Sequence, residues 1–348
     1  MTASPGKKST IVRTQKTALR LLFTAAEHTL PGTAARVAER LWFRVPGTGH
    51  AGALPAGEGF TVRSRGIAVR GRHWGSGPTV YLVHGWAGQS TQLAALVAPL
   101  LEARFGVVAF DAPGHGRSDP GAGGPGTGHA VEFGQALDEV AARFGPAHAV
   151  VAHSMGAMAT LLALKHGWLG SERLVFLAPM DALDRYLDQF AQHLHIGPRV
   201  RVRLDRRILA RVGYPVAEFD LAQLATEIPR PPLLVVHDRG DREVPFDRSR
   251  QLLQVWPEAT LQATEGLGHR RILSDPAVVA SIVRFTRGDD GDQDATRGAD
   301  GVSVVPDRSS VAAGRPAVVA GGSSVVADRP SMAADVSGQA SIAAASSW

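Results

Sequence analysis

The sequence contains no cysteine among its 348 residues. A disulfide framework and a cysteine-based metal site are therefore excluded, and the redox compartment stays undetermined. A long apolar segment is also lacking near the N-terminus. The pattern predicts two helices there, at 17–30 and 33–43, but both are too short and too polar to span a bilayer, which takes about 20 apolar residues. Aromatic residues are missing from residue 288 until the terminal Trp348, so this tail differs in kind from the rest of the chain.

Composition divides the chain into three parts. Residues 1–58 form a basic extension with helical patterning, residues 59–286 carry the apolar runs and turn signals of a globular domain, and residues 287–348 are rich in small residues. The middle part is long enough to bury a large core. In the tail, the six residues from Ser303 recur imperfectly from Ser324. Two weakly apolar copies are too few to build a solenoid, so we expect the tail to be disordered.

Positive charge is concentrated at the N-terminus. The whole chain has a formal net charge of +5, whereas residues 1–50 alone hold eight Lys or Arg and two Glu. Such an arm can attract membrane surfaces or polyanions. It lacks the aromatic and glycine-rich patterns of nucleic-acid modules, so we expect no nucleic-acid partner. Peripheral membrane contact is an alternative, but we prefer a solvated basic helix. Because Arg20 interrupts the apolar stretch, the segment is a poor signal peptide and we expect a cytoplasmic protein.

From residue 60 the pattern changes to short strands. Segments 60–64 and 67–74 predict an antiparallel hairpin at a sheet edge, and after them apolar strands alternate with helices. We expect strands at 79–83, 106–110, 147–152, 174–178, 232–237 and 259–263, and helices at 89–104, 129–144 and 276–287, with a further helix between the last two strands. Such alternation predicts an α/β fold with a mostly parallel, doubly wound sheet. Ligands then bind beyond the carboxyl ends of the strands.

The segment 146–160 predicts a strand, a sharp turn and a helix, with Ser154 at the turn. Such a turn strains the backbone of its central residue, so the residues two before and two after it must be small, as Ala152 and Gly156 are. Because the strain is useful only if the hydroxyl must be exposed above the sheet, we interpret Ser154 as a nucleophile. The alternative is that Ser154 merely caps the helix.

A serine nucleophile needs a histidine base that a carboxylate orients. In this architecture the three occur in the order serine, acid, histidine. Among the thirteen histidines, only His269 follows both Ser154 and the acidic cluster after the strand at 232–237. Within that cluster we prefer Asp241 as the acid, because it reaches further over the sheet edge. Asp238 lies nearly on the strand and could instead bond its own turn.

A glycine-rich turn at 84–88 follows the strand at 79–83. Together with the backbone amide of Met155, the amide of Trp86 could bind the oxyanion that forms when Ser154 attacks a carbonyl. The alternative is a plain connection from a strand to a helix. We also expect the pocket to be apolar near Trp86 and Met155.

Taken together, these stretches resemble the α/β-hydrolase fold enzymes. The resemblance covers about residues 60–286, with five stretches in family order: His84-Gly85-Trp86, Phe110 to Ser118, Ala152 to Gly156, Asp241 to Pro245, and Gly268-His269. The family elbow usually begins with glycine, so Ala152 departs from the pattern. In the family the loop that holds His115 and Arg117 is mainly structural, which implies no chemical step for them.

The resemblance also implies a mechanism. Ser154 would attack a substrate carbonyl with His269 as base, and water would then hydrolyse the acyl-enzyme. Because serine and not aspartate stands at the turn, relatives that displace halide or open epoxides are disfavoured. We expect no cofactor.

Residues 182–230 form a segment too long for a simple crossover. Helical stretches at 182–193, 200–212 and 219–228 predict a helical cap. Residues 199–212 hold six arginines and one aspartate, which could steer an anionic or membrane-borne substrate, although we prefer the solvated face of the cap. His193 and His195 lie two apart and face different ways on a helix, so we predict no metal.

The favoured function is a serine hydrolase that cleaves a carboxylic ester or a related small acyl compound. One alternative is a non-catalytic protein that binds a small molecule or a partner in the same pocket. Carbon–carbon bond hydrolysis and cofactor-free peroxidation are further alternatives on this scaffold. The complete set of serine, acid and histidine favours the enzyme, because a binding protein has no need of all three.

Overall fold

The computed structural model describes residues 5–47, 52–289 and 302–304. Within them, nine strands form one sheet in the order β1-β2-β4-β3-β5-β6-β7-β8-β9. The strands are β1 (Glu58–Ser64), β2 (Ile67–Trp74), β3 (Thr79–Val83), β4 (Gly106–Asp111), β5 (Ala147–His153), β6 (Ser171–Leu177), β7 (Leu233–Asp238), β8 (Thr260–Thr264) and β9 (Val302–Val304). β1 and β2 form an antiparallel hairpin that continues antiparallel onto β4, and the other neighbours pair in parallel. The predicted mostly parallel α/β sheet with an edge hairpin is confirmed.

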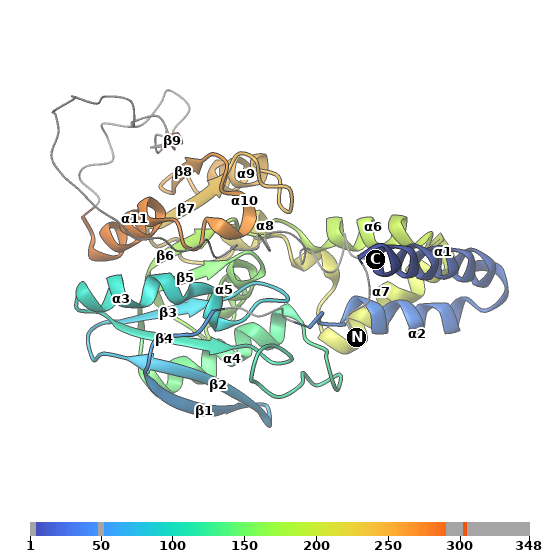
Figure 1. Cartoon of the computed structure of the whole chain (residues 1–348), viewed down its shortest axis with the longest axis horizontal. Coiled ribbons are helices and arrows are strands. Elements are labelled where there is room, and N and C mark those ends of the chain that lie inside the picture. Colours follow the sequence, from blue (N-terminus) through green and yellow to red (C-terminus); the bar gives the residue numbers. More distant parts are fainter. Residues whose placement is uncertain (1–4, 48–51, 290–301, 305–348) are drawn as a thin grey trace, which may run out of the picture.

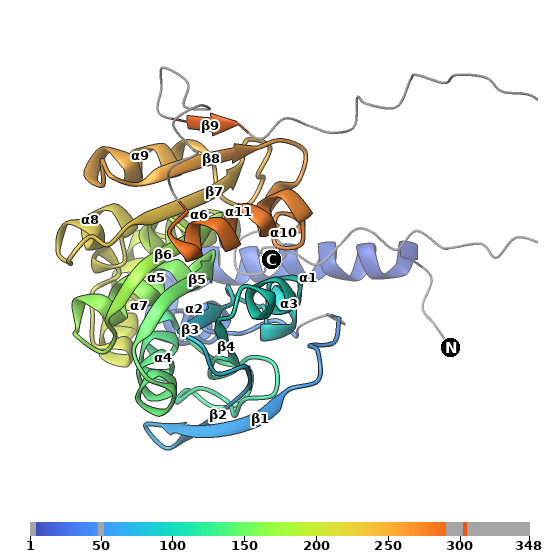
Figure 2. The same ribbon diagram turned by 90° about the vertical axis from the view of Figure 1, so that its left-hand side faces the viewer.

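Helices cover both faces of the sheet (Figure 2). They are α3 (Ala94–Glu102), α4 (Ala130–Phe144), α5 (Met155–Lys165), α8 (Leu221–Thr226), α9 (Asp247–Val255), α10 (Gly268–Arg271) and α11 (Pro276–Arg287). α3 and α11 pack on one face and α4, α5, α8 and α9 on the other. Because successive residues of a strand point to opposite faces, Val80 and Leu82 of β3 join the first core, whereas Tyr81 and Val83 join the second. A strand buried on both sides must be apolar throughout.

Two local details differ from the predicted pattern. The helix expected at 89–104 begins as a 3₁₀ turn at Ser90–Leu93 and becomes α-helical only in α3. The residues around His269, for which the pattern predicts no helix, form the short helix α10. Four residues are too few to show helical periodicity, so this short helix cannot be predicted from the pattern of apolar residues.

The helices predicted within residues 182–230 are present as α6 (Leu183–Leu194) and α7 (Pro198–Val212), followed by a 3₁₀ turn at Val216–Glu218 and by α8. α7 begins with proline at its first position and ends before Gly213, which has a φ of +85°. These are the residue types that begin and end helices most often. The helices between residues 182 and 230 therefore lie largely where the sequence pattern predicts them.

The N-terminal helices α1 (Pro5–Thr29) and α2 (Pro31–Trp42) pack against α6 and α7, and the four helices group at one end of the molecule (Figure 1). The buried Glu27 carboxylate accepts hydrogen bonds from the amides of Arg199 and Val200, at 2.7 and 3.3 Å, in the first turn of α7. Glu39 of α2 forms ion pairs with Arg207 and Arg211 of α7. The basic extension is thus joined to the cap by specific side-chain contacts.

Among the described residues, no helix has both the length and the apolar composition that a bilayer span requires. Of the tail, only residues 287–289 and β9 are described, and β9 pairs in parallel with β8 at the sheet edge. The remaining part of the predicted disordered tail, including most of its repeat, lies outside the described residues.

Replacing Glu27 by alanine removes the acceptor for two amides at the start of α7 and one link between α1 and the cap. We expect the free energy of unfolding to fall by roughly 1–2 kcal/mol, because the two amides at the start of α7 would lose their hydrogen-bond acceptor. Urea denaturation measures this change. Glu258→Ala, at an exposed position, serves as the control and should stay within about 0.5 kcal/mol of wild type. Equal stability of the two variants would contradict the capping role.

Candidate active site

Ser154 lies at the turn between β5 and α5 with a φ of +51°. This region of backbone space is unfavourable for residues other than glycine. Both backbone groups of Ser154 are hydrogen bonded: its amide donates to the carbonyl of Leu177 at 3.0 Å, and its carbonyl accepts from the amide of Met180 at 3.2 Å. The end of β6 and the chain after it therefore hold the strained residue in place.

Small residues around the turn allow this close packing. A Cβ atom added to Gly156 would lie 2.8 Å from the carbonyl oxygen of Val83 and 2.7 Å from that of His84. One added to Gly85 would lie 2.9 Å from the Cβ of Ser154. Ala152 is fully buried between β3 and β6, so a methyl group is accommodated where the family usually has glycine.

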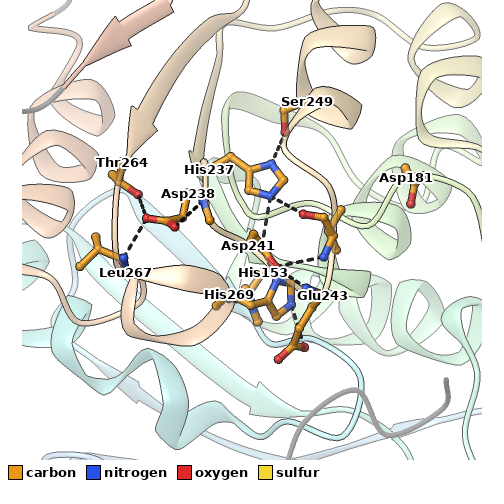
Figure 3. Close-up of polar contacts among 12 residues, drawn as sticks. His153, Asp181, His237, Asp238, Asp241, Glu243, Ser249, Thr264, Leu267 and His269 are labelled. Atoms are coloured by element: carbon orange, nitrogen blue, oxygen red, sulfur yellow. Dashed lines mark hydrogen bonds and ion pairs between the residues drawn. The ribbon is translucent and has the colours of Figure 1, made fainter. Parts of the chain in front are cut away.

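His269, in α10, lies against the acid that the sequence favours (Figure 3). Its Nδ1 donates to Asp241 Oδ2 at 2.7 Å. The other carboxylate oxygen of Asp241 accepts from the backbone amides of Glu243 and Val244, at 2.7 and 3.0 Å. Because Nδ1 carries the proton that Asp241 binds, Nε2 of the neutral ring is left as an acceptor.

A second histidine, His237, contacts the same carboxylate from the end of β7. Its Nε2 lies 3.2 Å from Asp241 Oδ2 and 3.1 Å from the carbonyl of Val244, and its Nδ1 lies 2.7 Å from Ser249 Oγ. Burial raises the pKa of Asp241, but the hydrogen bonds from His237 and His269 oppose this and hold the pKa well below its ordinary value. Asp241 is therefore ionised throughout the neutral range.

Asp238 performs a different task from Asp241. Its carboxylate accepts from the amide of Gly240, from Thr264 Oγ1 and from the amide of Leu267, each at 2.9 Å. These bonds tie the loop after β7 to the end of β8 and to the loop after it. The geometry thus favours Asp241 over Asp238 as the partner of His269.

Glu243 and His153 also lie beside His269, and sequence reasoning assigned neither of them a role. Glu243 Oε2 lies 3.6 Å from His269 Nε2, and Oε1 lies 3.5 Å from Arg270 Nε. Burial raises the pKa of Glu243, although His269 and Arg270 counteract part of this effect. Glu243 belongs to the acidic cluster after β7, but nothing in the sequence indicated which acidic side chains turn toward His269.

His153, directly before Ser154, packs its ring 4.7 Å from that of His269, centroid to centroid. Its Nε2 lies 3.1 Å from the carbonyl oxygen of His269. Burial holds the pKa of His153 well below its ordinary value, so the ring is neutral and donates from Nε2 to this carbonyl. His153 thereby connects the elbow to α10.

Ser154 and His269 line one cavity together with Trp86 and Met155. In the described part of the chain, no hydrogen bond joins Ser154 Oγ to His269 Nε2. Without a substrate this contact is often long, and it closes on binding. The rest of the wall is mainly apolar and includes Trp42 and Phe43 from the N-terminal extension, Leu183, Tyr186, Ile208 and Val212 from the cap helices, and Met180 and Phe219. The expected apolar surroundings of Trp86 and Met155 are therefore present.

The two amides expected to bind an oxyanion belong to elements that border this cavity. Met155 is the first residue of α5, so its amide has no partner within the helix. Trp86 lies in the turn after β3, where the amide of Ala87 donates to His115 Nε2 at 3.2 Å. Burial lowers the pKa of His115 to about 3, so the ring stays neutral and can accept. His115 thus supports the turn, in agreement with the structural role that the resemblance implies.

Several arginines of α7 form ion pairs, and the guanidinium carbon of Arg211 lies 4.2 Å from the ring centroid of Phe43, which lines the cavity. Arg201 forms ion pairs with Asp188 and Asp205, and Arg207 and Arg211 pair with Glu39. None of the six arginines at 199–212 is among the cavity-lining residues. Their contacts favour the interpretation as the solvated face of the cap, with additional links to α2. No group of three metal-ligating side chains occurs in the described ranges.

Comparison with known proteins identifies the class of protein that this fold and site define. Residues 80–282, more than half of the chain, match the Alpha/beta hydrolase family. The chain belongs to this family. No curated protein matches the sequence.

Solved structures with the same fold are distant in sequence. An esterase from Exiguobacterium antarcticum is 17% identical, with a TM-score of 0.52 over 66% of this chain and 100% of the esterase. A bromoperoxidase from Bacillus anthracis is 16% identical, with a TM-score of 0.52 over 67% and 100% of the two chains. A bacterial membrane phospholipase A is 17% identical, with a TM-score of 0.52 over 78% and 96%. At these identities the likeness shows the fold alone.

The lowered pKa of Asp241 predicts a pH-dependent stability. A carboxyl group whose pKa is lower in the folded chain stabilises the fold above its ordinary pKa, about 4. That contribution is lost as the pH falls through the lower folded value. We expect Asp241→Asn to be less stable than wild type by roughly 2–4 kcal/mol at pH 7 and the difference to shrink at pH 3. Urea unfolding at both pH values measures it.

The exposed Asp247 at the start of α9 offers a control for this experiment. Asp247→Asn should change stability little at either pH. A difference between Asp241→Asn and wild type that is the same at pH 7 and pH 3 would contradict the assigned electrostatic role of Asp241.

Proposed function

We propose that this protein is a serine hydrolase that cleaves a carboxylic ester or a related acyl compound through an acyl-enzyme intermediate. One observation carries the proposal. Ser154 is held at a strained turn beside the same cavity as His269, and the Nδ1 of His269 is bonded to the buried Asp241. A strained turn, an oriented base and a shared cavity are what an activated serine requires.

In this mechanism Ser154 Oγ attacks the substrate carbonyl carbon while His269 Nε2 takes the hydroxyl proton. The backbone amides of Trp86 and Met155 stabilise the negative charge that develops on the carbonyl oxygen. Collapse of the tetrahedral intermediate breaks the bond to the leaving group, which receives the proton from His269 and departs. Asp241, ionised at neutral pH, stabilises the imidazolium that forms during both transfers.

The second half of the reaction uses the same groups with water as the nucleophile. His269 Nε2 removes a proton from water, which attacks the acyl carbon and forms a second tetrahedral intermediate. Its collapse returns the proton to Ser154 Oγ and releases a carboxylic acid. The mainly apolar wall that the cap contributes supports an acyl group of aliphatic or aromatic character.

Hydrolysis of p-nitrophenyl esters with short to long acyl chains tests the proposal. We expect the wild type to turn over and Ser154→Ala to lose about a thousandfold or more in kcat, as removal of an activated serine does. Ser274→Ala, at an exposed position outside the cavity, should keep the wild-type rate. The dependence on acyl length then measures the reach of the apolar wall.

A fluorophosphonate probe provides a second readout. It should label the wild type and the Ser274→Ala control but not Ser154→Ala. If no ester is hydrolysed and the probe does not label Ser154, the enzyme proposal is wrong. A protein that binds a small molecule in this cavity then becomes the better explanation.

A further inference from the structure

A second cavity adjoins the one that contains Ser154. The loops that follow β7 and β8 line it, mainly Gly240, Arg242, Glu243 and residues 266–271. Glu243, His269 and Arg270 line both cavities. The two cavities are therefore adjacent, and these three side chains lie where they adjoin.

Arginine side chains border the second cavity, in contrast to the apolar wall of the first. Arg242, Arg270 and Arg271 all line it. Arg242 and Arg271 are exposed, and neither forms an ion pair within the described residues. Arg271 also donates to the carbonyl of Gly266, which holds its guanidinium over the turn. Guanidinium groups suit phosphate and carboxylate groups, because their donors form a planar fork.

The acidic side chains nearby, two of which line the same cavity, offset only part of this charge. Asp238 is fully buried, with its carboxylate bonded to Gly240, Thr264 and Leu267. Glu243 lies beside His269 and Arg270, and its negative charge offsets the positive charge of Arg270. Glu265 pairs with Arg239, at 3.7 Å, outside the cavity lining. Three arginines and two carboxylates therefore line the cavity, and Arg242 and Arg271 have no ion-pair partner among the described residues.

The chemistry of acyl transfer decides which part of a substrate reaches this cavity. The leaving group must lie beside His269 Nε2, because that atom gives it a proton. Nε2 faces Glu243, whose other oxygen lies beside Arg270, so this edge of the ring borders the junction of the two cavities. If the acyl group lies along the apolar wall of the first cavity, the far end of the leaving group lies in the arginine-lined cavity.

We propose that the arginine-lined cavity binds an anionic group, a phosphate or a carboxylate, on the alcohol or thiol part of the substrate. This inference rests on the proposed function, because it assigns the two cavities to the two halves of an acyl substrate. Arg242 and Arg271 are the residues that select the anion.

Butyrate esters of three phenols test the selection: 4-hydroxybenzoate, its neutral methyl ester, and 4-hydroxyphenyl phosphate. The measured quantity is the ratio of kcat/KM for an anionic ester to that for the neutral ester. Because the phenols differ in intrinsic reactivity, each variant is compared with wild type by this ratio. We expect Arg242→Gln and Arg271→Gln each to lower the ratio roughly fivefold, and kcat/KM for the neutral ester to stay unchanged. Added salt should lower the wild-type ratio.

Arg206→Gln, on the exposed face of α7, is the matched control and should leave the ratio unchanged. Suppose that hydrolysis of the neutral ester depends on Ser154 but that neither Arg242→Gln nor Arg271→Gln changes the ratio. This result would overturn the inference, whereas the proposed function would still hold. A ratio that Arg206→Gln lowers equally would also overturn it, because general surface charge would then explain the effect.

Direct binding decides the question even if no ester is hydrolysed. Calorimetry on the Ser154→Ala protein with phenyl phosphate and with benzoate shows which anion the cavity accepts. Binding that falls roughly fivefold or more when Arg242→Gln or Arg271→Gln is added, but not with Arg206→Gln, supports the inference. Absence of binding for both anions, or binding insensitive to Arg242 and Arg271, contradicts it.

Discussion

The strained backbone of Ser154 is the constraint on which the proposed site depends. A φ of +51° is maintained because hydrogen bonds from Met180 and to Leu177 fix both backbone groups of this residue. The neighbouring glycines allow β3 and its following turn to approach within van der Waals distance. As a result, the serine, the amide of Met155 and the turn that carries Trp86 occupy fixed relative positions. The ends of three parallel strands, β3, β5 and β6, thus hold the strained residue in place. This explains why the site lies at the carboxyl edge of the sheet.

A buried carboxylate is the second constraint, because an ionised group without partners would be costly in the interior. Asp241 is supplied with His237 and His269 as ring donors and with two backbone amides. The bond to His269 also selects the tautomer with a free Nε2, which is the form that can accept a proton. His237 acts through Asp241 and is itself held by Ser249. It is therefore a positioning residue, and its polar partners account for a histidine on a core strand.

Much of this arrangement was predictable from local sequence. The apolar strands and the elbow at Ser154 follow from short-range patterns. Asp241 and His269 were selected by the order of serine, acid and histidine known for this architecture. Contacts between distant segments were not predictable, because periodicity shows that a helix has a buried face without showing what covers it. Trp42 and Phe43 therefore looked like part of a separate extension, whereas they line the cavity beside cap residues about 140 positions later. Glu243 was missed for a similar reason, since neighbouring acidic residues differ only in side-chain direction.

The distribution of charge also shows that local sequence does not predict which residues border the cavity. The arginine-rich run at 199–212 is the most prominent basic feature of the cap, yet half of its arginines pair with acids of α2, α6 and α7 and none borders the cavity. The arginines that line the cavity beside His269 come from the short segments that carry the proposed acid and base. Electrostatic influence on a bound group depends on distance and on uncompensated charge, not on the number of like residues in a run. The proposed anion selection therefore rests on Arg242 and Arg271, which line a cavity beside His269, and not on the basic face of α7.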